Sequence, residues 1–359
     1  MPKPINPIVI IIFTLAQTLL TEAPLRGQIF VANWNSGTIG EYTTSGVVIN
    51  ASLVSGLYNP SGIAVDENGN VFVANYSLGR IGEYTASGAT INASLITASY
   101  GVEGIALDGN GYLYARSYAN GVVGKYTTSG ATVNAALITG LPYSGGIALD
   151  GKGNLFLTVR RNGTNDAISQ YSTSGVLLNS NLITGLQLPG AIALDGNGNV
   201  FVRNTGNGTV GVYASSGTPI NTNLISGLDN SWGLALDGNG HLLVPQFVSF
   251  GNGIVAQYST SGTLLNGAFI SGLNFPFGVA LKPPPRPPVL RDSVVVNGEF
   301  KFNWNSITGR SYQVQFRTNL YESDWFNLGN SVLATNDTAT MSDVVSSNTN
   351  RFYRVILMP

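Results

Sequence analysis

The amino-acid sequence predicts an all-β fold, with a closed ring of six four-stranded blades followed by a small β-sandwich. Three observations lead to this prediction. One segment recurs six times at a nearly constant interval, each repeat divides into four short strand-like runs, and the two ends of the repeat region carry complementary halves of one unit. A unit of this length, repeated head to tail, is typical of solenoids and propellers.

The repeat is clearest between Gly62 and Asn75, where the chain runs Gly-Ile-Ala-Val-Asp-Glu-Asn-Gly-Asn-Val-Phe-Val-Ala-Asn. Its Asp position recurs at intervals of 42, 42, 45, 42 and 45 residues. The six residues at this position are Asp66, Asp108, Asp150, Asp195, Asp237 and Lys282. Such regular spacing indicates one supersecondary unit per repeat.

Each unit contains four short apolar runs, represented by residues 104–107, 71–73, 81–84 and 89–96. Their alternation and their β-branched and aromatic content predict strands, and no helical period is present. The Asp-Gly-Asn-Gly sequence between the first two runs predicts a type I turn. Four antiparallel strands with no covering helix are typical of a β-propeller blade.

The ends of the repeat region predict how the ring closes. Residues 29–33 match the second strand of a unit, and no first strand precedes them. Residues 278–281 match a first strand, and no second strand follows. Pairing these two segments completes a ring of six blades and removes the free sheet edges of an open stack.

The motif from Gly62 to Asn75 resembles the NHL repeat, and the whole region 28–282 resembles the wider group of six-bladed propellers that contains streptogramin lyases and gluconolactonase-like proteins. The matching residues are those that build blades, so the resemblance implies a fold more than a function. It also implies two expectations for an active member: a histidine in the mouth of a streptogramin-type lyase, and a channel metal in a gluconolactonase-like one.

The first 27 residues predict a signal peptide, because Lys3 precedes an apolar run of about 13 residues, too short to span a bilayer. A buried core helix is the alternative. The protein is therefore expected to be secreted, to the cell surface, periplasm or medium. A net charge of -1 argues against nucleic-acid binding, and the absence of cysteine excludes disulfides and thiolate chemistry.

After the ring, residues 283–288 form a proline-rich stretch that predicts a semi-rigid linker. Residues 289–359 then alternate in short strand-like segments at 293–296, 299–304, 312–316, 325–328 and 352–357. This module is similar to a fibronectin type III domain, and a spacer or adhesion role is expected.

Length variation points to one face of the ring. From the turn Asp to the third-strand Tyr the count is 18 or 21 residues, whereas from that Tyr to the next turn it is always 24. The insertions therefore lie in the loops after the second strand, which share a face with the blade-connecting loops. Repeat proteins concentrate such insertions on their binding face.

Arginine and aromatic side chains gather in these loops. The candidate ligand-binding residues are Arg116, Arg160, Arg161, Arg203, Trp34, Tyr76, Tyr118, Trp232, Phe247 and Phe277, and Tyr143, Phe275 and Asp166 lie in the same loops. Guanidinium groups bind planar anions and aromatic rings suit sugars or peptides, so we expect a non-catalytic protein that binds an anionic glycan or a protein partner. We expect it to be a monomer. Alternatively, these arginines cover apolar surface and the rings pack between blades.

Residues for catalysis are few. The single histidine, His241, falls in a turn on the opposite face, and no catalytic residue is assigned. The repeated Asp residues suit turn geometry better than calcium binding, because a twelfth-position acid is absent. Glu103 and Asp229 are candidate ligands for a channel Ca²⁺ or Mg²⁺, which would make the chain a metal-dependent lyase or lactone hydrolase; a solvated Glu is the simpler account of Glu103.

Overall fold

The structure is a computed structural model that describes residues 10–12, 28–98, 101–161, 165–229, 232–249, 251–283, 288–307, 309–319, 321, 324–336, 338–344 and 351–358. It divides into two compact units, one of Arg26–Pro284 and one that joins Met1–Leu25 to Pro285–Pro359. Each unit is described by itself. No described helix reaches the length and hydrophobicity that a bilayer span requires.

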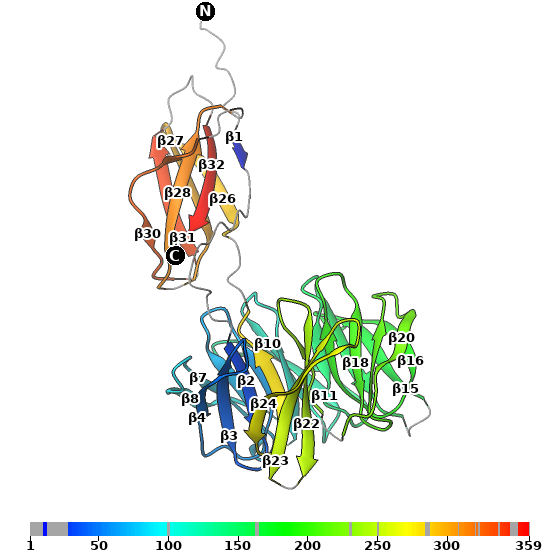
Figure 1. The fold of residues 1–359 in the computed structure, drawn as a ribbon. Helices are drawn as coiled ribbons and strands as arrows, with labels where there is room; N and C mark the ends of the chain where they lie inside the picture. Colours follow the sequence, from blue (N-terminus) through cyan, green and yellow to red (C-terminus); the bar gives the residue numbers. More distant parts are fainter. Residues whose placement is uncertain are drawn as a thin grey trace, which may run out of the picture. The chain divides into compact units, whose positions relative to one another are not determined.

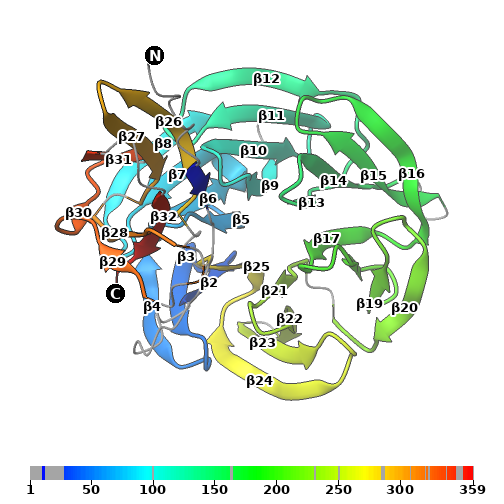
Figure 2. The same cartoon turned by 90° about the horizontal axis from the view of Figure 1, so that it is seen from above.

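The described part of the unit Arg26–Pro284 is built from four-stranded antiparallel sheets arranged around a centre (Figures 1 and 2). Their strand orders are β25-β2-β3-β4 (Pro276–Leu281, Gln28–Asn33, Thr38–Thr43, Val48–Val54), β5-β6-β7-β8 (Pro60–Val65, Val71–Asn75, Arg80–Tyr84, Thr90–Thr97), β9-β10-β11-β12 (Val102–Leu107, Tyr112–Ser117, Val122–Thr127, Thr132–Ile138), β13-β14-β15-β16 (Ile147–Leu149, Asn154–Val159, Asp166–Ser172, Leu177–Leu186), β17-β18-β19-β20 (Pro189–Leu194, Val200–Asn204, Thr209–Tyr213, Pro219–Ile225) and β21-β22-β23-β24 (Ala235–Leu236, His241–Ser249, Asn252–Ser259, Leu264–Leu273). A single turn of 3-10 helix, η1 (Tyr76–Leu78), follows β6. The predicted four strands per repeat are present.

The two ends of this unit pair with each other. In the sheet β25-β2-β3-β4, Ile29 lies opposite Leu281 and Val31 lies opposite Val279 in antiparallel register. The first strand of this sheet therefore comes from the end of the repeat region and the other three come from its beginning, as the complementary half-repeats predict.

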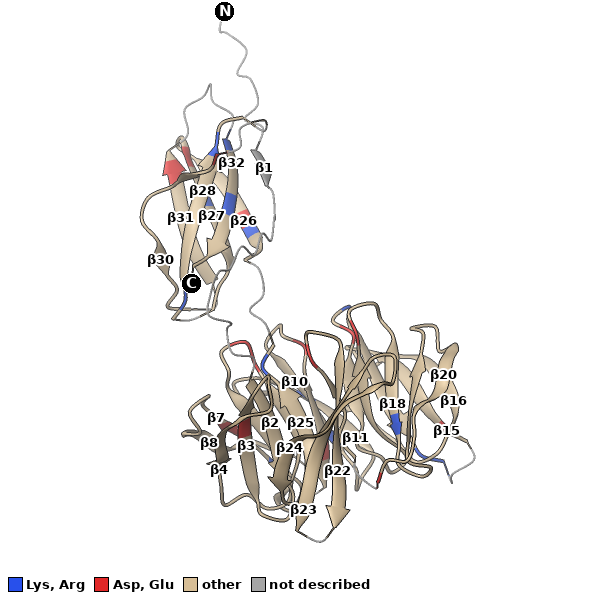
Figure 3. Ribbon diagram, in the orientation of Figure 1, with Lys and Arg blue, Asp and Glu red and all other residues tan. Residues whose placement is uncertain are grey.

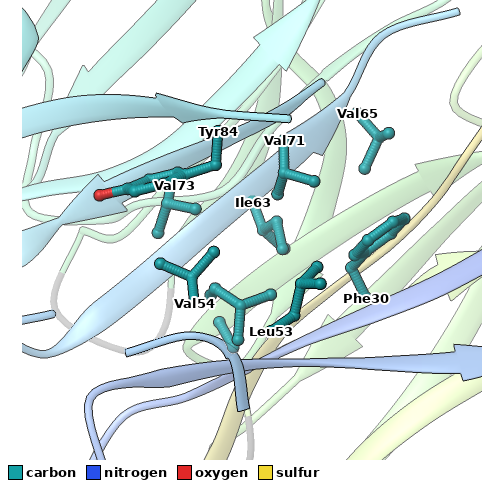
Figure 4. Close-up of a cluster of buried hydrophobic side chains, with 10 residues drawn as sticks. Phe30, Leu53, Val54, Ile63, Val65, Val71, Val73 and Tyr84 are labelled. Carbon is teal, nitrogen blue, oxygen red and sulfur yellow. The ribbon is translucent and has the colours of Figure 1, made fainter. Parts of the chain in front are cut away.

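The apolar core lies between neighbouring sheets (Figure 4). In one cluster Phe30 and Leu53, from β2 and β4, pack against Val71, Val73 and the tyrosine ring of the next sheet. That ring belongs to Tyr84, one of six third-strand tyrosines that recur through the repeats, and it is 4% exposed. Burial of these apolar faces between sheets supplies the main stabilising free energy of the ring.

Charged side chains are sparse along the strands of this unit (Figure 3), in keeping with a composition of 10% charged residues. The turn aspartates act as hydrogen-bond acceptors within their own turns. The Asp66 carboxylate accepts the Asn70 N–H at 2.7 Å, and the Asp108 carboxylate accepts the N–H groups of Asn110 and Tyr112 at 2.7 and 3.1 Å. These bonds from the Asp side chain to the backbone are typical of Asx-type turns, whereas the sequence predicted a type I turn.

The second unit holds two sheets on a common core. One is β26-β27-β31 (Leu290–Val296, Glu299–Asn305, Thr338–Val344), and the other is β1-β32-β28-β29 (Ile10–Ile12, Arg351–Leu357, Ser311–Arg317, Phe326–Asn327) with β30 (Val332–Leu333) paired to β28. Trp304 is 0% exposed between Phe302 and Tyr312. Strands β30 and β31 were not predicted from the sequence.

Strand β1 belongs to the predicted signal peptide, residues 1–27, whose other residues lie outside the described ranges. It pairs in parallel with Arg351–Tyr353 at the start of β32. The signal peptide stays a prediction. The predicted linker 283–288 also lies largely outside the described ranges, because only its first and last residues are described.

Candidate ligand-binding site

The loops after the second strands lie against the blade-connecting loops, because backbone hydrogen bonds tie them together. The amides of Trp34 and Thr205 donate to the carbonyls of Phe275 and Leu188 at 3.0 and 3.1 Å. The amides of Tyr76 and Tyr118 donate to Asn59 and Gly101 in the same way, at 3.2 and 2.8 Å. The two loop classes that the sequence places on one face therefore do share that face, which we call the mouth.

The mouth contains a cavity of about 580 Å³. It is lined by Arg160, Leu188, Thr205, Gly206, Trp232, Phe247 and Phe275. These residues come from four successive sheets, so the cavity occupies one side of the mouth. Its volume lies within the range of roughly 300–1,000 Å³ typical of small-molecule sites.

A second hollow of about 220 Å³ forms the central channel. Its rim contains one equivalent residue from each of the six repeats, at the start of or just before the first strand. These residues are Ser61, Glu103, Gly145, Gly190, Trp232 and Phe277. Trp232 lines both hollows, so the cavity and the channel adjoin at its indole.

Aromatic rings form a continuous stack across the mouth. The Phe277 ring stacks on Trp34 with centroids 5.0 Å apart and on Trp232 with centroids 6.1 Å apart. Tyr76 extends the stack beyond Trp34 at 5.2 Å. On the other side of the cavity Phe247 and Phe275 are 5.0 Å apart. Five of the six predicted aromatic residues, all except Tyr118, thus take part in these ring contacts.

Arg160 is the predicted arginine that lines the cavity. Its guanidinium carbon lies 5.6 Å from the centroid of the Trp232 ring, so a cation caps the end of the aromatic stack. The side chain is half-buried at the end of β14. Its donors are therefore held by stacking at the edge of an apolar cavity.

Glu103 is buried in the channel, 8% exposed. Its carboxyl group lies over Gly145, where a Cβ atom would collide with it, so glycine at this position makes room for the acid. Burial raises the pKa of the Glu103 carboxyl to about 7, although the positive charges of Arg116 and Arg160 act in the opposite direction. Glu103 is therefore desolvated, whereas the simpler account from the sequence was a solvated side chain.

Arg116 and Arg203 do not present their charges to the mouth, since both are 0% exposed. Arg116 donates to the Gly146 carbonyl of the next sheet at 2.9 Å, and burial lowers the pKa of its guanidinium to about 10. Arg203 donates to the carbonyls of Thr209 at 3.2 Å and of Asp229. Both side chains brace the backbone, which is closer to the structural alternative than to ligand binding.

The remaining candidates are separated from the cavity lining. Arg161 donates to the Asn181 side chain on β16 at 2.6 Å. Tyr118 packs with the exposed Tyr143, centroids 5.6 Å apart. Asp229 is exposed in its loop and lines neither hollow, so the structure does not bring it together with Glu103.

The model of the virginiamycin B lyase family matches residues 20–285. The chain belongs to the virginiamycin B lyase family. No curated protein sequence matches it significantly.

Solved structures similar to this family member share its propeller fold at low sequence identity. The crystal structure of a nidogen/laminin complex contains a chain with a TM-score of 0.61 and 17% identity, covering 72% of this chain and 100% of that one. A protein of unknown function from Bacteroides caccae has a TM-score of 0.54 and 16% identity, covering 71% and 98%. A gluconolactonase from Xanthomonas campestris has a TM-score of 0.51 and 13% identity, covering 77% and 91%.

In this member of the virginiamycin B lyase family the single histidine lies away from the mouth. His241 begins β22 and Phe247 lies six residues further along it, a separation of roughly 20 Å for an extended strand. The His241 ring bonds to the Asp237 carboxylate at 2.8 Å, in the turn where the sequence places it.

Within the described ranges, no group of three or more His, Asp or Glu side chains is arranged to hold a metal ion. The predicted metal-binding role of Glu103 and Asp229 stays a prediction.

Sequence reasoning did not select Leu188, Thr205 and Gly206, which complete the cavity wall. All three residues are uncharged and non-aromatic, so their residue types do not mark them as candidates for binding a ligand. The repeat alignment could have found them, because Leu188 and Thr205 occupy the same unit positions as Phe275 and Trp34.

Proposed function

We propose that this chain is a secreted, non-catalytic binding protein that takes an anionic glycan in the mouth cavity. In this proposal residues 28–282 form a complete six-bladed propeller of NHL type, residues 1–27 are a signal peptide, and residues 289–359 are a fibronectin III-like module beyond a proline linker. The protein acts as a monomer, without a resident cofactor.

The observation that carries the proposal is Arg160 stacked on Trp232 at the wall of an otherwise largely apolar cavity. Aromatic faces such as Trp232 and Phe277 offer flat apolar platforms on which the C–H face of a sugar ring stacks. The guanidinium donates parallel N–H bonds that match a carboxylate. A uronate sugar has both features, an apolar ring face and a carboxylate beside it.

A protein partner is the alternative occupant of the same face. The similar chain in the nidogen/laminin complex belongs to a protein assembly, and its likeness at 17% identity concerns the fold. We prefer the glycan because the mouth is hollow, whereas protein interfaces are usually broader surfaces of standard size.

A second candidate function, a lyase or lactone hydrolase, is favoured by Glu103. A carboxyl group whose pKa is raised to about 7 by burial suits proton transfer near neutral pH, and the family contains lyases by description. If a divalent cation in the channel is part of that activity, thermal unfolding should shift when EDTA is added. An unchanged melting temperature would argue for the binding protein.

The test of the proposed function compares Arg160→Ala with Arg161→Ala by affinity electrophoresis in gels that contain polygalacturonate or a neutral galactan. The neighbouring Arg161 is the matched control, since its guanidinium is engaged on β16 outside the cavity. Wild type and Arg161→Ala should be retarded by polygalacturonate alone. Arg160→Ala should lose at least about tenfold in affinity, the typical effect of removing a charged hydrogen bond. Equal retardation of both variants would contradict the proposal.

A further inference from the structure

Among the described residues, one position of the repeat adopts the left-handed backbone conformation in four of the units. It lies two residues before the channel-lining position, and its carbonyl accepts the N–H of the residue that follows the second strand. The four residues and their φ angles are Asn59 (51°), Gly101 (79°), Leu188 (47°) and Phe275 (57°).

The identity of the residue at this position changes with its surroundings. In two units it is Asn or Gly, the types that tolerate positive φ. In the other two it is Leu188 or Phe275, for which positive φ is unfavourable. Leu188 and Phe275 both line the 580 Å³ cavity, whereas Asn59 and Gly101 line neither hollow. The chain therefore accepts backbone strain at two of the positions where a bulky apolar side chain forms the cavity wall.

The surrounding structure holds this conformation in place at Leu188. The fully buried Asp166 carboxylate accepts the Leu188 N–H at 2.8 Å, and the Leu188 carbonyl accepts both the amide and the hydroxyl of Thr205, at 3.1 and 2.7 Å. At Phe275 the carbonyl accepts the Trp34 amide, and the ring packs on Phe247.

These contacts define an apolar subsite formed by Leu188, Phe247 and Phe275. It lies in the same cavity as Arg160 and Trp232. A ligand that fills the cavity therefore meets a cation on one part of the wall and a preformed apolar surface on another.

We propose that this subsite binds an aryl group attached to the anionic sugar, so that the ligand class is an aryl-substituted uronide rather than a plain polyuronate. The inference rests on the proposed function for the sugar carboxylate at Arg160. The aryl ring packs against Phe247 and Phe275, and the sugar ring stacks on Trp232. No bond is made or broken.

Calorimetric titration with three small glycosides tests the proposal: para-nitrophenyl glucuronide, methyl glucuronide and para-nitrophenyl glucoside. Burial of the aryl ring should make wild-type protein bind para-nitrophenyl glucuronide roughly tenfold or more tightly than methyl glucuronide. The glucoside, which lacks the carboxylate, should bind more weakly than the matching glucuronide.

The variants Leu188→Gly and Phe275→Gly sharpen the test, because glycine keeps the left-handed backbone while removing the apolar wall. Both should reduce the advantage of the aryl glucuronide to near one and retain binding of methyl glucuronide. Asn59→Gly is the matched control and should keep the wild-type ratio, because it alters the same unit position outside the cavity lining.

The outcomes separate the two proposals. If wild-type protein binds both glucuronides equally, the aryl subsite is overturned and the anionic-glycan function stands. If it binds the aryl glucoside as tightly as the aryl glucuronide, the subsite stands and the anion requirement is overturned. If it binds none of the three, both proposals are overturned.

Discussion

Glu103 shows how the channel sets the chemistry of one side chain. The glycine at position 145 leaves space for its carboxyl group, and only 8% of the Glu103 side chain is exposed. The charged groups that act on it, Arg116 and Arg160, oppose the effect of burial without cancelling it. At this scale the protein tolerates an acid that ionises with difficulty.

This burial predicts a pH-dependent stability. In the unfolded chain the Glu103 pKa is near the ordinary glutamate value of 4.5, and in the folded protein it is about 7. The native state therefore holds a proton that the unfolded state releases between these pH values, and ionisation destabilises it by up to about 3 kcal/mol as the pH rises through this window. Below it, both states are protonated.

Urea denaturation of wild type and Glu103→Gln at pH 4 and pH 8 measures the effect. The free energy of unfolding of wild type should fall relative to that of the variant between the two values, by an amount on the order of 1–3 kcal/mol. Parallel pH dependence of the two proteins would show that Glu103 ionises normally.

The arginines show what sequence reasoning could and could not predict for single residues. Arg160 follows β14 and lines the cavity, whereas Arg116 and Arg203 lie within strands β10 and β18 and not in the loops where they were predicted. The burial of Arg116 and Arg203 was not predictable from position, because it depends on carbonyl groups supplied by other parts of the chain, such as that of Gly146. Arg116 and Arg203 share one unit position, eight residues after the turn Asp, whereas Arg160 lies ten residues after Asp150.

At the scale of elements, a recurring close contact links each four-stranded sheet of the unit Arg26–Pro284 to the preceding sheet. The glycine in the turn between the third and fourth strands abuts a carbonyl on the fourth strand of the neighbouring sheet. The pairs are Gly46 with Phe269, Gly88 with Leu53, Gly130 with Leu95, Gly175 with Leu137, Gly217 with Leu182 and Gly262 with Leu224. The first pair joins the β3–β4 turn to β24, so this contact also occurs where the two ends of the repeat region meet.

A comparison of the variants Gly46→Ala and Gly56→Ala tests this contact between sheets. Both glycines have positive φ, 81° and 74°, so each substitution introduces strain of roughly 1 kcal/mol. A Cβ at Gly56 meets nothing within 4 Å, whereas a Cβ at Gly46 collides with the Phe269 carbonyl. Thermal unfolding should therefore show Gly46→Ala to be less stable than Gly56→Ala by at least about 1 kcal/mol. Equal melting temperatures would mean that the sheets do not meet there.

The strands themselves were largely predictable, because each one in the ring repeats a pattern of alternating apolar residues six times. The second unit offers no repetition, and β31 was missed. Its sequence Thr-Ala-Thr-Met-Ser-Asp-Val buries Ala339 and Asp343 on one face, so a polar residue interrupts the expected apolar alternation. The Asp343 carboxylate is compensated by Arg351 and by the Tyr353 hydroxyl, at 2.6 and 2.7 Å. That compensation comes from β32 and is invisible in the local sequence.

At the scale of the whole unit Arg26–Pro284, the pairing of β2 with β25 could be predicted from the two half-repeats at its ends, and the structure contains this pairing. The asymmetry of the mouth could not be obtained by counting. It arises because equivalent positions carry different side chains: glycine at 145 and 190, and aromatic rings at 232 and 277. One side of the mouth is consequently hollow beside Trp232, and the other is filled by stacked rings.

Hydrogen-exchange mass spectrometry with and without polygalacturonate tests the central claim, that the hollow side of the mouth is the binding site. Protection should appear in peptides that contain Arg160, Leu188, Trp232, Phe247 and Phe275. Peptides that contain the turn aspartates, such as Asp66 and Asp108, should exchange at unchanged rates. Protection confined to those turns, or to residues 288–358, would contradict the account.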